Sequence, residues 1–245
     1  MENLIPVLVY VVAVSSAEAL KLPPYITACS VKDPDLNSCV LKQAKVALPE
    51  LIKGDPKYKF PVLDPMIVEK LVIKGALNIE AEDLVVKGIR NTTLKSIDFD
   101  LKKKTMVMEL IGPEVHFEGK YRVEGKLASL PMNGKGTLEV SLYDLYVKYT
   151  THYELKTMKD GLKYLDFKDY EVECEPKGVK SQLNNLFNGN KVLGDAMNDF
   201  INNNWRDVLK EIGPSLYDAL AGVAHKIFQD TFMTVPYKDI FMDTE

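Results

Sequence analysis

Polar and apolar side chains alternate along residues 114–127, EVHFEGKYRVEGKL. Even-numbered positions carry charged side chains or histidine, and odd-numbered positions carry apolar side chains or glycine. Because successive side chains of a β-strand point to opposite faces of a sheet, this pattern predicts a long strand with one hydrated face and one apolar face. Periodicity alone leaves open whether the apolar face packs against a filled core or forms the wall of a pocket.

Similar alternating runs, separated by turn-forming residues, continue from about Ile67 to Cys174 and predict a sheet of several antiparallel strands. In one run the phase slips, because Leu142 and Leu145 are both apolar and two side chains must be skipped between them. We expect a β-bulge near Tyr143-Asp144, since an extra residue restores the apolar face and bends the strand. Long, bent strands predict a strongly curved sheet.

Apolar residues recur at helical spacing near both ends of the chain. The pattern predicts a short helix over Ser38–Lys53 and a long one over Ser181–Ile212. Gly213-Pro214 predicts a break, and a further helix is expected over residues 215–232. A helix, then many antiparallel strands, then long helices predict an α+β fold in which a highly curved sheet wraps the carboxy-terminal helix.

The amino terminus has the pattern of a secretory signal peptide. Residues 4–14 form an apolar run of eleven residues, too short to span a bilayer, and small residues follow it. Cleavage is expected after Ala17 or Ala19. We therefore expect residues 1–19 to be a signal peptide and residues 20–245 to be a single secreted domain. In a secreted chain Asn91-Thr92-Thr93 is an N-glycosylation sequon, which makes Asn91 a candidate glycan site.

Charge and hydropathy exclude two classes of partner. The formal net charge of −4 combines 31 basic with 35 acidic residues, and no basic run interleaved with aromatic residues is present, so we expect no nucleic acid partner. No segment after the signal peptide has eighteen consecutive apolar residues, so stable membrane insertion is not expected. A chain of 245 residues is long enough to bury a sizeable core.

Secretion makes the three cysteines interpretable. Cys29 and Cys39 enclose a short polar loop, which favours a local disulfide in an oxidising compartment. Cys174 is left over, and its expected state is a buried thiol, with intermolecular pairing as the alternative. A zinc site is disfavoured because no second cysteine or histidine stands at ligand spacing beside Cys174.

Motifs of catalysis and cofactor binding are absent from the sequence. It contains no G-x-S-x-G, no glycine-rich phosphate loop and no H-E-x-x-H. His116, His152 and His225 are far apart, without cysteines or carboxylates at ligand spacing. We therefore expect no enzyme, no catalytic residues, no cofactor and no metal.

The carboxy-terminal run of residues 186–241, LFNGNKVLGDAMNDFINNNWRDVLKEIGPSLYDALAGVAHKIFQDTFMTVPYKDIF, resembles the terminal signature of the insect takeout and haemolymph juvenile-hormone-binding protein family. The amino-terminal half is similar to that family too. It has the signal peptide, the cysteine pair, and Gly54-Asp55-Pro56 followed by Pro61-Val62-Leu63-Asp64-Pro65. The resemblance covers essentially the whole mature chain.

The resemblance implies a secreted carrier with the tubular lipid-binding (TULIP-like) architecture, in which a curved sheet and a long helix enclose an apolar tunnel. The implied ligand is a terpenoid such as juvenile hormone, a long-chain fatty acid or a quinone-like lipid. We expect the protein to be a monomer. The sequence leaves open whether it also binds a protein receptor transiently. Members that bind juvenile hormone often carry a second disulfide, which the lone Cys174 cannot form, so the resemblance favours the takeout branch.

We hypothesise that two sets of side chains line the tunnel. One wall is expected from the sheet, and its residues are Met106, Met108, Leu110, Phe117, Tyr121, Val123, Leu138, Val140 and Leu142. The other wall is expected from the helix, and its residues are Met197, Phe200 and Trp205. Tyr121 and Tyr217 are candidates to hydrogen-bond a polar end of the ligand. The alternative is an extracellular protein-interaction module with a filled core or a vestigial tunnel.

Overall fold

The computed structural model describes residues 19–244, so the predicted signal peptide lies outside the described residues except for Ala19. The elements, in chain order, are β1 (Cys29–Ser30), α1 (Leu36–Leu51), η1 (Pro56–Tyr58), β2 (Met66–Ile73), β3 (Leu77–Lys87), η2 (Ile89–Asn91), β4 (Thr93–Asp100), β5 (Thr105–Leu127), β6 (Leu130–Thr157), β7 (Lys163–Glu175), β8 (Gly178–Leu183), η3 (Phe187–Gly189), α2 (Lys191–Asn203), α3 (Trp205–Phe232), α4 (Tyr237–Ile240) and β9 (Phe241–Met242). No helix in this part of the chain is long and apolar enough to cross a membrane.

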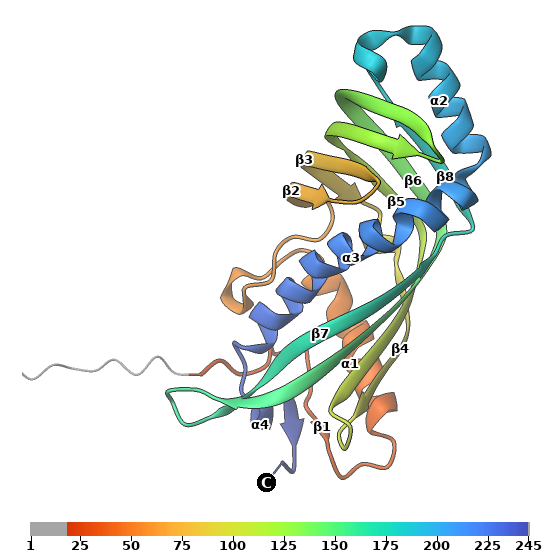
Figure 1. The fold of residues 1–245 in the computed structure, drawn as a ribbon. Coiled ribbons are helices and arrows are strands. Elements are labelled where there is room, and N and C mark those ends of the chain that lie inside the picture. Colours follow the sequence, from red (N-terminus) through yellow and green to blue (C-terminus); the bar gives the residue numbers. More distant parts are fainter. Residues whose placement is uncertain (1–18, 245) are drawn as a thin grey trace, which may run out of the picture.

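Two long strands, β5 and β6, form the axis of the main sheet (Figure 1). They pair antiparallel from Thr105↔His152 to Leu127↔Leu130. At one end β3 pairs with β5 and β8 with β6, and β2 continues the sheet beyond β3. At the other end β4 pairs with β5 and β7 with β6. Among the described strands, β2 pairs only with β3 and β7 only with β6, so the sheet does not close into a barrel.

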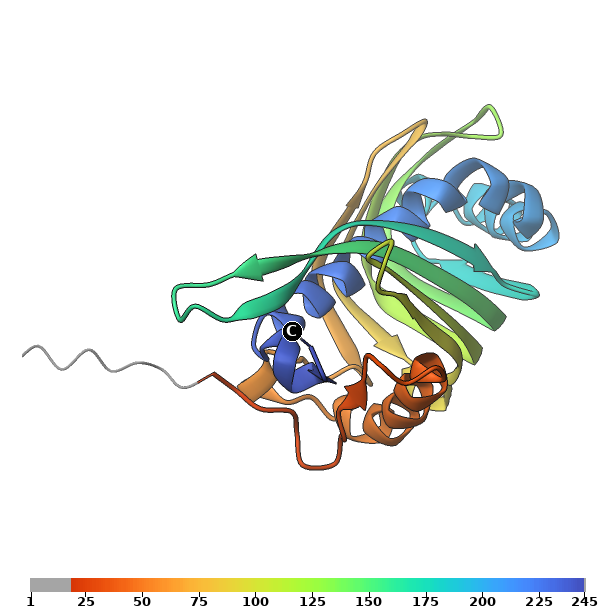
Figure 2. The same ribbon diagram turned by 90° about the horizontal axis from the view of Figure 1, so that it is seen from below.

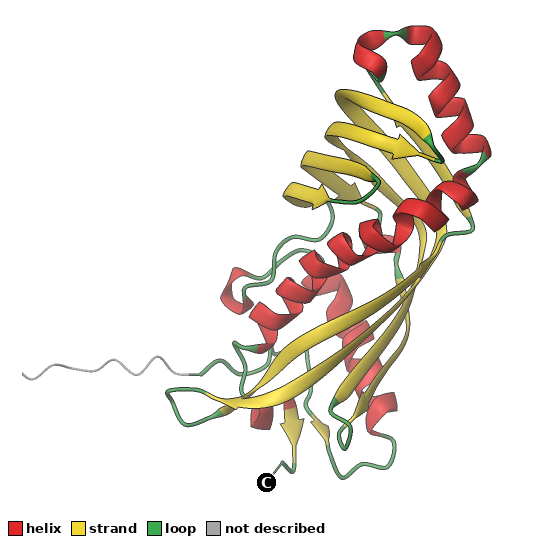
Figure 3. Cartoon of the chain, in the orientation of Figure 1, coloured by secondary structure: helices red, strands yellow, loops and turns green. Residues whose placement is uncertain are grey.

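The helix α3 runs obliquely along the concave side of this sheet, as the views in Figure 2 and Figure 3 show. It packs against β7 and β2, while α1 packs against β4 and α2 lies beside β8. The predicted arrangement of a curved antiparallel sheet around a long carboxy-terminal helix is therefore present.

The predicted boundaries of the carboxy-terminal helices are wrong in two places. Residues 181–183 belong to β8, because the side chains of this short strand alternate between the cavity and the outer face of the sheet and its backbone pairs with β6. The helix begins at Lys191. The helix breaks at Asn204, whose side-chain amide donates to the Phe200 carbonyl at 2.8 Å, and continues through Gly213-Pro214. A proline inside a helix removes one hydrogen bond. Burial of Val208 and Ala221 on either side holds the flanking turns in place.

The phase slip in β6 is real, but its predicted cause is not. Leu142 and Leu145 are both buried with two exposed residues between them. The register between β5 and β6 is the same on both sides of this point, so no extra residue is inserted and the predicted bulge is absent from this pair. Instead, Asp144 adopts a left-handed conformation with φ 45°, at the position that the register places opposite Pro113. Proline has no N–H to donate, so a break in the ladder costs little here.

Buried apolar side chains form two clusters along the sheet. The first lies between β2, β3, β8, the adjoining parts of β5 and β6, α2 and the first half of α3. The second lies between α1, β4, β7, the other ends of β5 and β6, and the last turns of α3. Its most deeply buried side chains include Met106, Phe167 and Phe241.

The structure joins Cys29 and Cys39 in a disulfide, as the spacing predicts. Cys29 lies in β1 and Cys39 in α1, so the bond ties the amino-terminal strand to the first helix. The strand β1 pairs in parallel with β9, with Cys29 opposite Phe241, and this brings the two ends of the described chain together. Cys174 is a free thiol, and burial raises its pKa to about 12, which keeps it in the unreactive neutral form.

The edge of β8 is covered by two asparagine side chains of α2. Asn202 accepts the Ser181 N–H at 2.8 Å and donates to the Ser181 carbonyl at 2.9 Å. Asn198 does the same for Leu183, with both distances at 2.9 Å. Because Asn198 and Asn202 are one helical turn apart, their side-chain amides act as the peptide groups of a neighbouring strand would. An exposed strand edge is thereby closed without another strand.

We expect Asn202→Ala and Asn198→Ala to lower the free energy of unfolding by about 1–3 kcal/mol each, because each leaves a backbone N–H and C=O of β8 without partners. Urea denaturation measures the change. The matched control is Asn203→Ala, since Asn203 is exposed on the same helix. Equal stability of all three variants would contradict a role for the amides in holding α2 to β8.

A buried histidine lies among the aromatic side chains of the second cluster. The Nδ1 atom of His225 is 2.7 Å from the Tyr149 hydroxyl, and its ring centroid is 4.8 Å from that of Tyr170. Burial lowers the pKa of His225 below its usual value, although the nearby charge of Asp169 opposes the shift. The neutral imidazole is therefore the form that the fold favours.

Stability is expected to fall as the pH drops below about 6.5, the usual pKa of histidine, because the unfolded chain then binds a proton that the folded chain resists. The contribution of His225 to the free energy of unfolding is fully present above pH 6.5. It is lost as the pH falls toward the lower pKa that His225 has in the folded state. Urea unfolding at pH 7.5 and 5.5 should show a smaller difference for His225→Gln than for the wild type. The same difference in both proteins would count against His225 as the titrating group.

Candidate functional site

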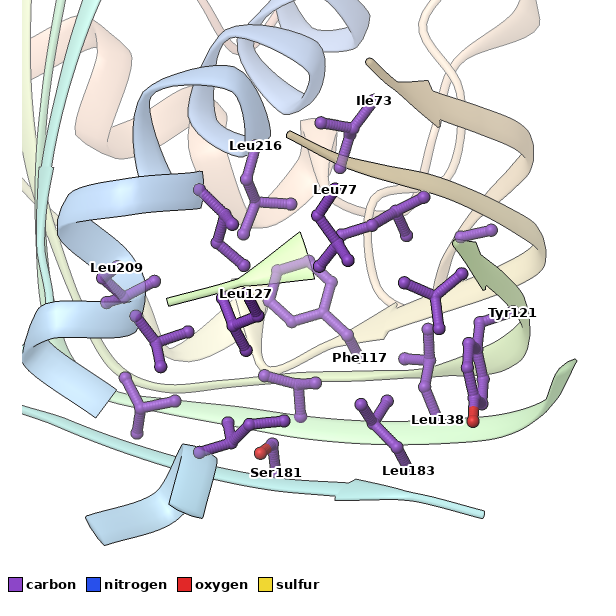
Figure 4. Close-up of a pocket in the computed structure, with 18 of the residues that line it drawn as sticks. Ile73, Leu77, Phe117, Tyr121, Leu127, Leu138, Ser181, Leu183, Leu209 and Leu216 are labelled. Carbon is purple, nitrogen blue, oxygen red and sulfur yellow. The ribbon is translucent and has the colours of Figure 1, made fainter. Parts of the chain in front are cut away.

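An apolar cavity of about 170 Å³ lies inside the first cluster. Its walls come from β2, β3, β5, β6 and β8 on the sheet side and from α2 and α3 on the helix side (Figure 4). Each strand supplies alternate residues, because only every second side chain faces the concave side of the sheet. In β5 these are the odd-numbered positions, among them Phe117, Tyr121 and Leu127. The helix α3 supplies one stripe, from Trp205 to Leu220.

The lining carries no charged side chain. Three of its residues, Tyr121, Ser181 and Trp205, have polar side-chain atoms. The Tyr121 hydroxyl donates to the Asn184 carbonyl at 2.9 Å, and burial raises the pKa of this phenol to about 12, so it stays neutral. The cavity therefore offers apolar surface with very few hydrogen-bonding groups.

This arrangement suits binding rather than catalysis. Binding sites for small molecules are typically apolar hollows with a few placed polar groups. No group of three or more potential metal ligands occurs among residues 19–244. The volume resembles that of an engineered apolar cavity of about 150 Å³ that binds benzene, and is below the roughly 300–1,000 Å³ of typical ligand sites. A longer ligand would thus require side chains such as Phe117, near the centre of the view in Figure 4, to move aside.

Residues 7–242 match the family model of haemolymph juvenile hormone binding protein. The chain belongs to this family. It is 28% identical over 231 residues to the circadian clock-controlled protein daywake of Drosophila melanogaster, covering 89% of this chain and 88% of the relative. It is also 28% identical over 235 residues to daywake of Drosophila yakuba, again covering 89% of this chain and 88% of that protein.

A solved structure of the same type is that of Epiphyas postvittana Takeout 1. The two chains superpose with a TM-score of 0.77 at 26% sequence identity, covering 89% of this chain and all of Takeout 1. This likeness confirms the predicted α+β, TULIP-like architecture, with a long carboxy-terminal helix against a large open sheet. The predicted membership of the takeout and juvenile-hormone-binding family is confirmed as well.

About half of the predicted tunnel residues lie around the cavity. Those that line it are Phe117, Tyr121, Val123, Leu138, Val140, Leu142 and Trp205. Met197 and Phe200 belong to the surrounding apolar cluster without lining the cavity. Those outside are Met106 and Met108 in the second cluster, Leu110 farther along β5, and Tyr217 in α3. Ligand contact by any of these residues stays a prediction.

Sequence reasoning missed three parts of the wall. They are the inward residues of β2 and β3, those of β8, and most of the stripe on α3. The alternation of Leu77, Ile79 and Ala81 in β3 was a usable signal. Ser181 and Leu183 of β8 fall within Ser181–Ile212, where the sequence predicts a helix, so the pattern does not identify them as strand residues of the wall.

Proposed function

We propose that this protein is a secreted carrier that binds one small hydrophobic ligand in the cavity between the sheet and α3. The observation that carries the proposal is a partly open hollow whose lining is apolar and free of charge, inside a protein of the haemolymph juvenile hormone binding protein family. The proposed ligand is a terpenoid such as juvenile hormone, a long-chain fatty acid or a quinone-like lipid. Catalysis, a cofactor and a metal have no part in this function.

Burial of apolar surface supplies free energy of the size that such binding requires. Each buried methylene contributes about 0.8 kcal/mol, so ten of them contribute roughly 8 kcal/mol. Association costs about 4–15 kcal/mol in lost translational and rotational freedom. The two quantities are similar in size. Affinity therefore depends on how completely the ligand fills the cavity and on any hydrogen bond that it gains.

Native mass spectrometry of the protein secreted from insect cells tests the proposal. We expect a bound molecule in one-to-one ratio, released by organic solvent and identified as a hydrophobic compound. A bare polypeptide that also refuses neutral and fatty-acid probes would contradict the proposal. That result would favour the alternative, an extracellular protein-interaction module with a filled core.

A pair of variants links binding to the cavity. Val140→Trp adds bulk to the lining, whereas Glu139→Trp adds the same bulk on the exposed face of the same strand. We expect Val140→Trp to weaken uptake of a hydrophobic probe at least about tenfold, since its indole occupies the ligand's space, and Glu139→Trp to leave uptake unchanged. Overpacking costs roughly 1–3 kcal/mol, so thermal unfolding must show that both variants are folded. Equal uptake by the two variants would place the ligand elsewhere.

Secretion and glycosylation form a separate part of the proposal. Asn91 is exposed at the end of η2, beside Arg90, whose backbone N–H donates to Asp64 at 2.8 Å. We expect insect cells to release the chain into the medium, cleaved after Ala17 or Ala19 and carrying a glycan removed by peptide-N-glycosidase. Asn91→Gln should lack that glycan. Retention of the uncleaved chain inside the cells would contradict secretion.

A further inference from the structure

The β5–β6 turn, residues 127–130, lies between the cavity and solvent. Leu127, the last residue of β5, lines the cavity and is 1% exposed. The next two residues, Ala128 and Ser129, are exposed on the protein surface. Met132 is buried and lines the cavity again. At this point a single turn of the chain therefore separates the cavity from water.

The first turns of α3 form the facing side of this part of the cavity. Val208, Leu209 and Ile212 line it from the helix. Figure 4 shows Leu127, Leu209 and Leu216 facing the same space. The turn and the helix thus meet over a shared apolar hollow, and a ligand could pass between them if the turn moved away from the helix.

One hydrogen bond joins the turn to α3. The backbone N–H of Ala128 donates to Oε2 of Glu211 at 2.9 Å, and within residues 19–244 no second hydrogen bond connects residues 125–134 to this helix. Ala128 and Glu211 are both exposed, so the bond lies on the surface, outside Leu127. An exposed hydrogen bond stabilises a structure only modestly. This contact can therefore break and re-form while the sheet and the helix stay intact.

The backbone of the turn is strained. Ala128 and Ser129 have φ angles of 48° and 68°, in the left-handed region that residues other than glycine adopt at a cost. Two-residue hairpin turns of this kind usually contain Asn-Gly, because both positions need a positive φ. Here neither position is glycine. The strain favours movement of the turn once its bond to Glu211 is lost.

We propose that the ligand enters and leaves the cavity between the β5–β6 turn and α3, and that the Glu211 carboxylate holds this entrance closed. The inference rests on the proposed carrier function and adds the place where the ligand is exchanged. Glu211 is a positioning residue, because it holds the turn and does not line the cavity. Affinity depends on the lining, which the contact does not change. The entrance therefore controls the rates of binding and release.

Amide hydrogen exchange of the ligand-free protein, measured by NMR, tests whether Glu211 holds the turn. We expect Glu211→Ala to speed exchange of the Ala128 amide by roughly 2- to 12-fold, the effect of losing one ordinary hydrogen bond. Glu211→Gln keeps an acceptor oxygen and should retain most of the protection. The control is Asp207→Ala, since Asp207 is an exposed carboxylate of α3 that pairs with Lys210 at 2.7 Å. Unchanged exchange in Glu211→Ala would overturn the role of Glu211.

Stopped-flow fluorescence with N-phenyl-1-naphthylamine, a neutral hydrophobic probe, tests whether the contact controls exchange of the ligand. We expect the association and dissociation rate constants of Glu211→Ala both to rise by roughly 2- to 12-fold, while their ratio, the dissociation constant, stays nearly the same. Asp207→Ala should match the wild type. A weaker affinity with an unchanged association rate would instead show damage to the lining and overturn the inference.

A covalent bridge between the turn and α3 makes the opposite change. The double variant Ala128→Cys, Glu211→Cys is joined by a short bis-maleimide, while the native Cys29–Cys39 disulfide and the buried Cys174 thiol stay unreactive. We expect the bridge to slow both rates by more than about tenfold relative to the unbridged double variant, because the entrance can no longer open. Thermal unfolding checks that each variant is folded.

The outcomes separate this inference from the carrier function. Unchanged rates after bridging, with binding of the probe intact, would place the entrance elsewhere. Faster amide exchange in Glu211→Ala without faster binding would overturn control of the entrance by Glu211. Absence of probe binding in the wild type would overturn the carrier function and the entrance with it.

Discussion

The long antiparallel ladder of β5 and β6 is the constraint on which the rest of the fold depends. The strand β5 pairs with β6 from end to end, and β3, β4, β7 and β8 each pair with one of these two strands. Near Pro113 and Asp144 the outer neighbours change, from β3 and β8 on one side to β4 and β7 on the other. One continuous pair thus supports two sheet halves, and α3 lies against both. The two apolar clusters follow directly from this division.

The two halves are filled by different kinds of side chain, and the apolar cavity lies in the first of them. The second cluster contains many aromatic rings, and pairs such as Phe99 with Phe241 and Phe167 with Phe232 pack edge to face at centroid distances of 5.4 and 5.1 Å. Large flat rings in this geometry leave little space between them. The first cluster is mostly Leu, Ile and Val on curved strands opposite a helix. Aliphatic side chains fixed on two curved surfaces leave the central space unfilled.

The alternating pattern is enough to identify the apolar face of β5 and β6 and, from it, six residues of the cavity wall. It could not divide that face between two clusters, because periodicity reports which side of the sheet a residue faces and not its position along it. A strand rises about 3.3 Å per residue, so Met106 and Val123 lie roughly 56 Å apart along β5. Strand length was thus a signal that could have separated the methionines from the cavity.

Other errors came from interactions that sequence patterns do not record. Gly213-Pro214 predicts a break, yet tertiary packing on both sides of it keeps α3 continuous. The sequence predicts a helix for residues 181–183 because a strand of six residues is too short for its alternation to outweigh the helical spacing that follows, and its partner β6 lies about forty residues earlier.

The edge of β8 and the cavity are parts of the same local arrangement. Asn202 satisfies both backbone groups of Ser181, and this leaves the hydroxyl as the one group of that residue without a good partner. Ile201, the neighbour of Asn202 in α2, itself lines the cavity. The contact that protects the strand edge therefore also fixes one wall of the cavity. A change in how α2 packs on β8 would therefore alter the shape of the cavity.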